Sequence, residues 1–397
     1  MRIGQHRPSV DEHAALMRSL LVFERRTETV ALDEALGRIT ARAVTSPVDL
    51  PLFRNSQMDG FAVRASDIAA VPAKLPIVGE IPARPGQPAP LAPGTAVRIM
   101  TGAVVPDGAD AVVPVEDTTV VDGVAVIETP RVVGEYVRDR GSDLRAGDEL
   151  LPAATVLRSR HLAALAAAGI ASVEVLAPVR VAVITTGAEL AAPGVDPQPG
   201  QVYDANAIAI VSAVRAAGAS VVISARVTDD HDTFRAALAA ATDAADLVIT
   251  SGGISMGDYE VVREVLEPLG ATVTTIAMQP GGPQATAVID GVPVISFPGN
   301  PVSTQISVEM FVAPVLRELA GLPAARRQSR VLDTDVRSVP GKRQLLRGRA
   351  VGEDGVTVVG GPSSHLVAGL AASDLLIDIP EATVQLRKGD TVETLAL

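Results

Sequence analysis

The segment SGGISMGDYE, residues 251–260, combines residue types that could bind a phosphate group. It follows DLVIT, an apolar run typical of a strand, and precedes VVREVLEPLG, which has helical spacing. Gly252 and Gly253 would let backbone N–H groups approach a ligand, and a helix N-terminus favours an anion. Ser251 and Ser255 would add hydroxyl donors. A plain strand-to-helix turn explains the same residues, because the segment matches neither a GxGxxG fingerprint nor a Walker A motif.

Carboxylates fall on three loops of the same region: Glu189 in TTGAEL, Asp229 and Asp230 in TDDHDT, and Asp258 in SGGISMGDYE. Each alone fits a helix N-cap or a solvated loop acid, and Asp229 or Asp230 could cap the helix that begins near residue 232. Together they could hold Mg²⁺, which prefers oxygen ligands and often bridges to substrate phosphates. No Lys lies between residues 180 and 327, so N–H dipoles, a metal ion or an Arg must balance an anionic ligand there.

A fourth polar loop, FPGNPVS at residues 297–303, follows the apolar run VPVIS. Pro298 and Pro301 stiffen this turn, and Gly299 gives freedom between them. The loop could be a rigid connector in which Asn300 or Ser303 caps the next helix. A role in ligand contact fits the same residues.

Alternating strands and helices from residue 179 onward must position these loops. RVAVITTG, SVVISARV and DLVITSGG are typical of strands, and helical segments follow each of them. In the first of these helices, NAIAIVSAVRAAG at 206–218, we expect Ile208, Val211 and Val214 on one face. The pattern predicts a parallel α/β sheet, at whose carboxyl edge ligands bind.

The flanking segments differ from the α/β region in composition and in the spacing of their apolar residues. Residues 9–46 are predicted to be helical, with Ser9 as N-cap, and HLAALAAAG at 161–169 is a short predicted helix. Short Val-rich runs broken by Pro and Gly from about 47 to 140 predict a small β domain. The last ~70 residues return to short strands and predict a second one.

Composition excludes several classes of function. The formal net charge of −12 argues against nucleic acid and anionic membrane as partners. Because the chain has no Cys, disulfides, thiol catalysis and iron–sulfur clusters are excluded. No apolar run reaches about 18 residues, and the polar N-terminus lacks a signal-peptide core, so we expect a soluble cytoplasmic protein.

Several stretches, in the same order along the chain, resemble the MoeA family, which includes the E domain of gephyrin. They are NSQMDGFAVR (55–64), RIMTGAVVPDGADAVVPVED (98–117), TTGAEL, DAN (204–206), SGGISMGDYE and FPGNPVS. The resemblance implies a multidomain α/β plus β fold with four parts. These are an elongated discontinuous linker domain (1–46 and 144–178), an inserted β domain (47–143), a molybdopterin-binding α/β domain (179–327) and a C-terminal β-barrel (328–397).

The resemblance also implies an activity. Such proteins insert molybdenum from molybdate into adenylylated molybdopterin and release AMP, with Mg²⁺ as the usual ion. They form homodimers whose active site is shared between chains, and the adenylyltransferase of the same pathway is a candidate partner. Two alternatives stay open: a degenerate paralogue that only binds pterin or acts as a scaffold, and a molybdopterin adenylyltransferase.

Site residues carry over from the family position by position. The resemblance implies a catalytic role for Asp59, Asp143 and Asp230, and metal binding by Glu189 and Asp258. It implies substrate binding by Ser251, Gly252, Gly253, Ser255, Pro298, Gly299, Asn300, Pro301 and Ser364. His365 follows Ser364 in an S-H pair of the family near the cleft.

The chain departs from the family pattern where many members have charged residues. Ala188 replaces an acid in TTGAEL, and Gln279 and Gly282 stand where lysines are common. The stretch Gln284-Ala285-Thr286-Ala287 replaces a Gly-Phe-Gly type sequence. Arg343 and Arg347, in KRQLLRG of the last domain, are hypothesised to supply the missing positive charge from across the cleft.

Overall fold

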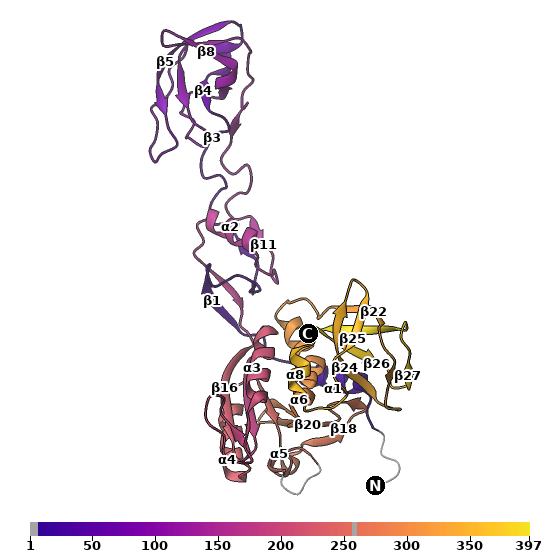
Figure 1. Ribbon diagram of the computed structural model, residues 1–397. Coiled ribbons are helices and arrows are strands. Elements are labelled where there is room, and N and C mark those ends of the chain that lie inside the picture. Colours follow the sequence, from indigo (N-terminus) through magenta and orange to yellow (C-terminus); the bar gives the residue numbers. More distant parts are fainter. Residues whose placement is uncertain (1–6, 256–259) are drawn as a thin grey trace. The chain divides into compact units, whose positions relative to one another are not determined.

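The computed structural model describes residues 7–255 and 260–397 of the chain. Thr27–Leu176 forms one compact unit, and Met1–Arg26 together with Ala177–Leu397 forms the other. The larger unit holds an α/β domain and a C-terminal β domain, and the smaller one holds two β-rich parts (Figure 1). This division leaves the first 26 residues with the α/β domain, whereas we assign them to the linker domain. The four domain boundaries stay a prediction.

The α/β domain is built on a six-stranded sheet in the order β16-β13-β17-β21-β20-β18. The strands are β13 (Arg180–Thr186), β16 (Ser220–Val227), β17 (Leu247–Ser251), β18 (Thr272–Thr275), β20 (Pro283–Ile289) and β21 (Val292–Phe297). The first four strands of that order are parallel to one another, as expected. β20 runs antiparallel to both of its neighbours, which was not predicted. Asp290 and Gly291 join β20 to β21 with φ of 51° and 82°, as a two-residue hairpin requires.

Helices cover both faces of this sheet. α1 (Val10–Leu20), α3 (Ala205–Ala216), α6 (Pro301–Ser307) and α7 (Ala313–Leu319) contribute to the core on one face. α4 (His231–Ala244) and α5 (Val261–Leu266) contribute to the core on the other. The face expected for α3 is wrong in part, because Ile208 is 62% exposed while Ile210 and Val214 are fully buried. Asn206 shares the buried face, one turn before Ile210.

The N-terminal helix is much shorter than predicted. Ser9 caps α1 and forms a capping box with Glu12, as its sequence position suggested. The helix ends at Leu20, and β1 (Thr27–Ala31) then pairs antiparallel with β12 (Ser172–Leu176). The prediction of helix to residue 46 is therefore wrong, since the β-branched residues of TETVA favour a strand.

The C-terminal domain is a closed five-stranded barrel. Its strands are β22 (Arg327–Leu332), β24 (Arg343–Val351), β25 (Gly355–Val358), β26 (Leu375–Ile379) and β28 (Thr391–Ala396). β24 pairs with both β25 and β26, which closes the sheet on itself. The short strand β19 (Met278–Gln279) adds in parallel to β24, so the loop after β18 is joined to the barrel by backbone hydrogen bonds.

The smaller unit contains a curled six-stranded sheet, in the order β7-β4-β6-β5-β9-β8. Its strands are β4 (Gly60–Val63), β5 (Ala73–Ile81), β6 (Ala96–Ile99), β7 (Ala111–Pro114), β8 (Thr118–Val121) and β9 (Val124–Ile127). Outside that sheet, β2 (Val44–Thr45) pairs with β11 (Glu149–Leu151), followed by the predicted helix, α2 (Ser159–Ala167). Among the described helices, none has both the length and the hydropathy that a membrane span needs.

Candidate functional site

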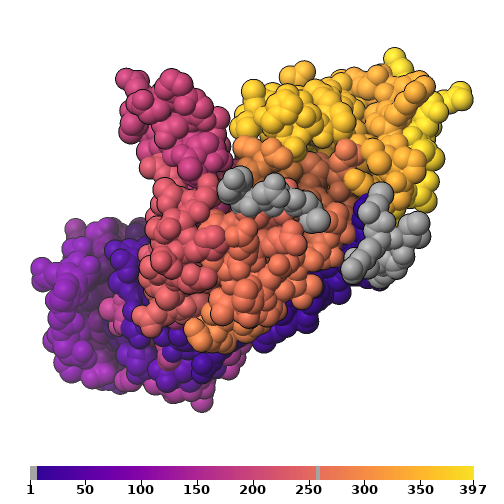
Figure 2. Space-filling model, turned by 90° about the horizontal axis from the view of Figure 1, so that it is seen from below, coloured from indigo at the N-terminus to yellow at the C-terminus, as the bar shows by residue number. Residues whose placement is uncertain are grey.

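A cavity of about 850 Å³ lies at the carboxyl ends of the parallel strands in the larger unit. Residues from TTGAEL, TDDHDT, SGGISMGDYE and FPGNPVS all line it, so the structure brings the four predicted loops together. The barrel contributes Lys342 and residues 362–364. Figure 2 shows the surface hollowed between a pink lobe of the α/β domain and the yellow C-terminal domain. This is the edge at which open α/β sheets bind ligands.

The SGG loop forms a tight turn that only glycine fits. Gly252 and Gly253 have φ of 98° and 65°. A Cβ on Gly252 would lie 2.6 Å from the Thr186 carbonyl oxygen, and one on Gly253 would lie 2.8 Å from Val262 Cγ2. Both glycines are therefore required by the backbone, whatever the loop binds.

Not every polar group of the SGG loop is available to a ligand. Gly252 donates its N–H to the Phe297 carbonyl at 3.1 Å, and Ser255 donates its N–H to Glu260 Oε2 at 2.8 Å. The N–H groups of Gly253 and Ile254 have no acceptor within the described ranges. The loop therefore offers two adjacent backbone donors, fewer than its sequence suggested.

The Ser251 side chain is an internal brace, in contrast to the ligand donor expected from sequence. Its hydroxyl is buried, donates to the Pro298 carbonyl at 3.2 Å and lies 3.2 Å from Thr304 Oγ1. It also accepts a hydrogen bond from Asn206 Nδ2 at 2.9 Å. These contacts join the end of β17 to the loop that follows β21.

Asn206 holds two of the cavity loops together. Its Nδ2 donates to Ser251 Oγ and, at 2.7 Å, to the Gly299 carbonyl. Its buried Oδ1 has no protein partner, and Asn206 lines the cavity. Asp204 caps the same helix by accepting from the Ala207 N–H at 3.0 Å and from Thr185 Oγ1 at 2.6 Å. We assigned Asn206 no role from sequence, although its place on the apolar face of α3 was a signal.

Of the carboxylates predicted on these loops, Glu189 and Asp229 line the cavity and Asp230 does not. Asp229 lines the cavity and accepts from the Ala188 N–H at 2.9 Å. Asp230 instead caps α4 through Thr233, whose hydroxyl and N–H hold the pKa of Asp230 below its ordinary value. Asp230 does not contribute to the cavity lining, so its expected place at the site is corrected to Asp229.

Glu189 and Asp229 are the open carboxylates with which a hard cation could be held. Asp204 and Glu260 also line the cavity, but both oxygens of Asp204 are hydrogen-bonded and Glu260 accepts the Ser255 N–H, whereas Asp229 has one oxygen on the Ala188 N–H and the other without a donor among the described residues. No cluster of three acidic or imidazole side chains occurs among residues 7–255 and 260–397. Asp258 lies outside the described residues. Two carboxylates with substrate phosphates suit Mg²⁺, which keeps several waters and takes few protein ligands, so the donor set fits that ion.

The positive charge at the cavity comes from Lys342. Among the described lining residues it is the sole Lys or Arg, and its ammonium has no hydrogen bond or ion pair in the described chain. Sequence reasoning chose its neighbours Arg343 and Arg347 instead. The missed signal was its place directly before β24, since Gln344, two residues further on, donates to the cavity residue Gln279 at 2.9 Å.

The expectation for Arg343 and Arg347 is corrected by their partners. Arg343 makes a bidentate pair with Asp378, with both distances 2.7 Å, and bonds to Asp11 at 2.7 Å. Arg347 is buried and donates to the carbonyls of Val359, Gly361 and Ser363. Burial lowers the pKa of Arg347, whereas Asp378 raises the pKa of Arg343. Both side chains hold the barrel together and are absent from the cavity lining.

The PGNP loop and Ser364 lie next to each other at the rim of the cavity, and a backbone hydrogen bond joins them. Pro298, Gly299, Asn300 and Pro301 all line the cavity, and Asn300 is the N-cap of α6 without a side-chain cap bond. Ser364 also lines it, and its carbonyl accepts from the Val302 N–H at 3.1 Å. His365 turns to Ser363 Oγ at 2.9 Å and is not part of the lining.

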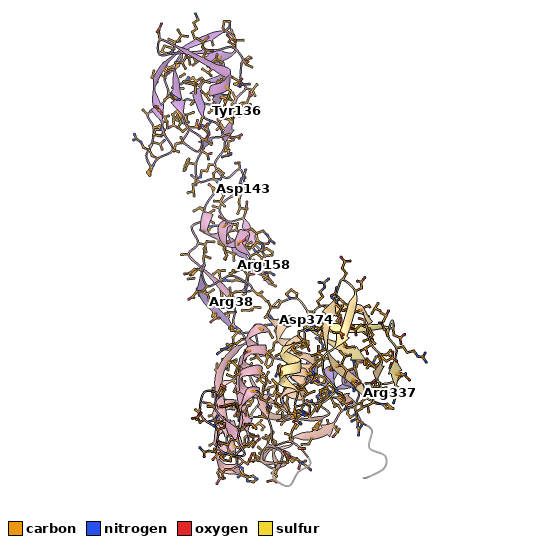
Figure 3. All side chains as sticks on the ribbon, in the orientation of Figure 1. Arg38, Tyr136, Asp143, Arg158, Arg337 and Asp374 are labelled. Atoms are coloured by element: carbon orange, nitrogen blue, oxygen red, sulfur yellow. The ribbon has the colours of Figure 1, made fainter. Side chains whose placement is uncertain are left out.

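Asp59 and Asp143 belong to the smaller unit. Asp59 Oδ1 accepts from the N–H and the hydroxyl of Thr101, at 2.6 and 2.7 Å. These bonds lower the pKa of Asp59. Asp59 therefore joins its turn to Thr101, and these bonds neither require nor contradict the catalytic role that the resemblance implies. Asp143 is exposed and lies on a loop outside the curled sheet (Figure 3).

Comparisons with known proteins cover nearly the whole chain. Family models match at residues 8–169 (MoeA N-terminal region, domain I and II), 182–318 (probable molybdopterin binding domain) and 329–397 (MoeA C-terminal region, domain IV). A Mycobacterium tuberculosis protein named molybdopterin molybdenumtransferase 2 is 42% identical, over 97% of this chain and 98% of its own length. The chain belongs to the MoeA family.

Other MoeA relatives agree in length and in fold. The molybdopterin molybdenumtransferase of Haemophilus influenzae is 32% identical over 97% of both chains. The crystal structure of a molybdopterin biosynthesis MoeA protein from Pyrococcus horikoshii superposes with a TM-score of 0.83 at 32% identity. It covers 98% of this chain and 99% of the Pyrococcus chain. The predicted fold class, an α/β domain with flanking β domains in the MoeA arrangement, is confirmed.

We predict that Asn206→Ala lowers the free energy of unfolding by about 1–3 kcal/mol, because the buried Ser251 hydroxyl and the Gly299 carbonyl lose their donor. Asn300→Ala is the matched control, since it removes the same carboxamide from an exposed position with no side-chain cap bond. Urea unfolding of the two variants measures the difference. Equal stability of both variants would contradict the bracing role of Asn206.

Proposed function

We propose that this chain is a molybdopterin molybdenumtransferase of molybdenum cofactor biosynthesis. It takes adenylylated molybdopterin and molybdate as substrates, inserts molybdenum into the dithiolene and releases AMP. The cavity carries the proposal. Among residues 7–255 and 260–397, it combines two backbone N–H groups without an acceptor, one lysine, and the carboxylates of Glu189 and Asp229 at the carboxyl edge of the sheet. That set suits a phosphate-linked ligand better than an uncharged one.

The chain's own groups bind and position the phosphates in this account. The N–H groups of Gly253 and Ile254 and the ammonium of Lys342 attract the anionic oxygens, and fixed dipoles need no reorganisation during reaction. The volume of about 850 Å³ is at the upper end for small-molecule sites, as a nucleotide joined to a pterin demands. No covalent enzyme nucleophile is needed: the two dithiolene sulfurs replace oxygen ligands of molybdate, which leave as water, and a water molecule adds to the pyrophosphate, so that AMP leaves and the pterin keeps its own phosphate.

Mg²⁺ is proposed as the resident ion, held by Glu189 and Asp229 with Asp258 as a further candidate. When bound, it would neutralise phosphate charge and polarise the bond that breaks. Asp229 Oδ2 accepts the Ala188 N–H, which would leave Oδ1 to bind the ion. In this chain a neutral residue stands at position 188 where many relatives carry an acid, so the ion has one carboxylate fewer nearby.

The remaining expectations stay proposals of the same account. We propose a homodimer in which Asp59 and Asp143 of one chain serve the cavity of the other, in the cytoplasm, with the adenylyltransferase of the pathway as donor of substrate. Ser255 and Ser364 stay proposed substrate contacts, with residues 298–301. Neither alternative function is favoured, because relatives that match over almost the whole chain bear the transferase name.

The first test is turnover by the purified chain with adenylylated molybdopterin, molybdate and Mg²⁺. We expect AMP release that requires both molybdate and the metal ion, and chelation with EDTA should abolish it. Tight pterin binding with no AMP release would contradict the proposal and favour a binding module.

The second test concerns the cation at the cavity. Lys342→Ala should raise KM for adenylylated molybdopterin about tenfold or more, as expected for a lost charge-assisted hydrogen bond. Lys388→Ala is the matched control, because Lys388 is exposed and does not line the cavity. Arg343→Ala should instead destabilise the fold by about 3 kcal/mol, since it leaves Asp378 buried without its main partner. An unchanged KM in Lys342→Ala would refute this role.

A further inference from the structure

A buried polar cluster lies behind the cavity, beneath the turn Gln279–Gly282. It consists of His13 on α1, Gln284 on β20, Ser307 at the end of α6 and the carbonyl of Gly281. The three side chains are at most 2% exposed. A buried polar group is costly unless it is hydrogen-bonded, so this cluster needs a structural or functional reason.

Gln284 is the centre of the cluster. Its Nε2 donates to the Gly281 carbonyl at 2.8 Å and to Ser307 Oγ at 2.9 Å. Its side chain lies on the opposite face of β20 from Ala285 and Ala287, which belong to the other core. The amide thus ties the cavity turn to α6 from behind.

The turn itself is a cavity wall with unpaired donors. Residues 279–282 all line the cavity. Gly281 has φ of 97°, and a Cβ there would lie 2.6 Å from Met278 Cε and 3.0 Å from Ser307 Oγ. Neither Gly281 nor Gly282 donates its N–H to a group in the described chain. Small shifts of this turn would therefore move donors at the cavity wall.

The remaining member of the cluster, His13, is a candidate partner for the carboxamide oxygen of Gln284. His13 Nε2 and Gln284 Oε1 are both buried, and neither has a partner that meets hydrogen-bond geometry. Burial lowers the pKa of His13 to about 4, and the Gln284 side chain opposes this by a smaller amount. A neutral imidazole with its proton on Nε2 would satisfy both orphan atoms.

The helix that carries Ser307 is irregular directly beside the buried cluster. Val308–Val312 (η4) is a π-helical turn directly after Ser307, and Pro314 follows it without an N–H to donate. Phe311 of that turn meets the His13 ring edge-on, with 4.7 Å between ring centroids. Single π-turns inside helices occur frequently at functional sites.

We propose that Gln284 is a positioning residue for substrate binding: with His13 as the partner of its carboxamide oxygen, it fixes the Gly281 carbonyl and so sets the glycine turn at the cavity wall. This rests on the proposed function for its substrate, adenylylated molybdopterin. The chain has Gln at 279 and Gly at 282, so the wall acts through backbone groups whose placement Gln284 controls.

The kinetic test compares four folded variants. Gln284→Met and His13→Leu should each raise KM about tenfold, the loss expected for one hydrogen bond, while kcat changes less. His13→Gln keeps an N–H donor near the Nε2 position and should restore most of the lost affinity. Ser307→Ala should have a smaller effect, because the bond from Gln284 to Gly281 survives. An unchanged KM in folded Gln284→Met, or no rescue by His13→Gln, would overturn the proposal.

A spectroscopic test on the wild-type chain requires neither enzyme turnover nor a substituted variant. In ¹⁵N spectra of the histidines of the wild-type chain, His13 should be a neutral Nε2–H tautomer at pH 7. A charged imidazolium or an Nδ1–H tautomer there would overturn the proposal.

A third measurement separates this proposal from the proposed function. If the wild type releases no AMP, the proposed function fails. Calorimetry of AMP binding to the wild type and to His13→Leu then tests whether His13 and Gln284 position the cavity wall. Equal affinity of the two would count against it.

Discussion

The carboxamide of Asn206 is the interaction on which the cavity most depends. It reaches from α3 to the end of β17 and to the loop after β21, so one side chain fixes the two glycine-containing loops against each other. Ser251 extends the same connection to Pro298 and Thr304. Without these bonds, two loops that meet only at the sheet edge would be free to separate, because glycine backbones have little intrinsic preference for one conformation.

A second constraint is electrostatic. The chain carries a net charge of −12, yet the proposed substrate is an anion. The charged side chains that would ordinarily attract it are engaged elsewhere, since Arg343 and Arg347 are used inside the barrel. Among the described lining residues, the groups that can attract an anion are Lys342 and the backbone N–H groups of the glycine turns, which buried carboxamide side chains position. In our account Asn206, Gln284 and Gln344 are therefore responsible for presenting those dipoles correctly.

Much of this site was predictable because the signals are local. Gly-Gly after an apolar run, a Pro-stiffened turn and carboxylates at strand ends identified all four loops that meet at the cavity. What failed depends on tertiary contacts. Ser251 faces inward because Asn206 reaches it, and Asp230 is used as a cap while Asp229 is not. The role of Lys342 needed the closed barrel and the parallel β19–β24 pairing, neither of which a strand pattern alone specifies. The buried cluster of His13 joins residues almost 300 positions apart, which no spacing rule predicts.

The central claim is that the unpaired N–H groups of the SGG loop, with Lys342, bind the phosphate of the substrate. A crystal structure of the chain with AMP tests it most directly. The account predicts phosphate oxygens within about 3 Å of the Gly253 or Ile254 nitrogen and of Lys342 Nζ. A phosphate bound elsewhere in the cavity, with both N–H groups and the ammonium facing solvent, would contradict it.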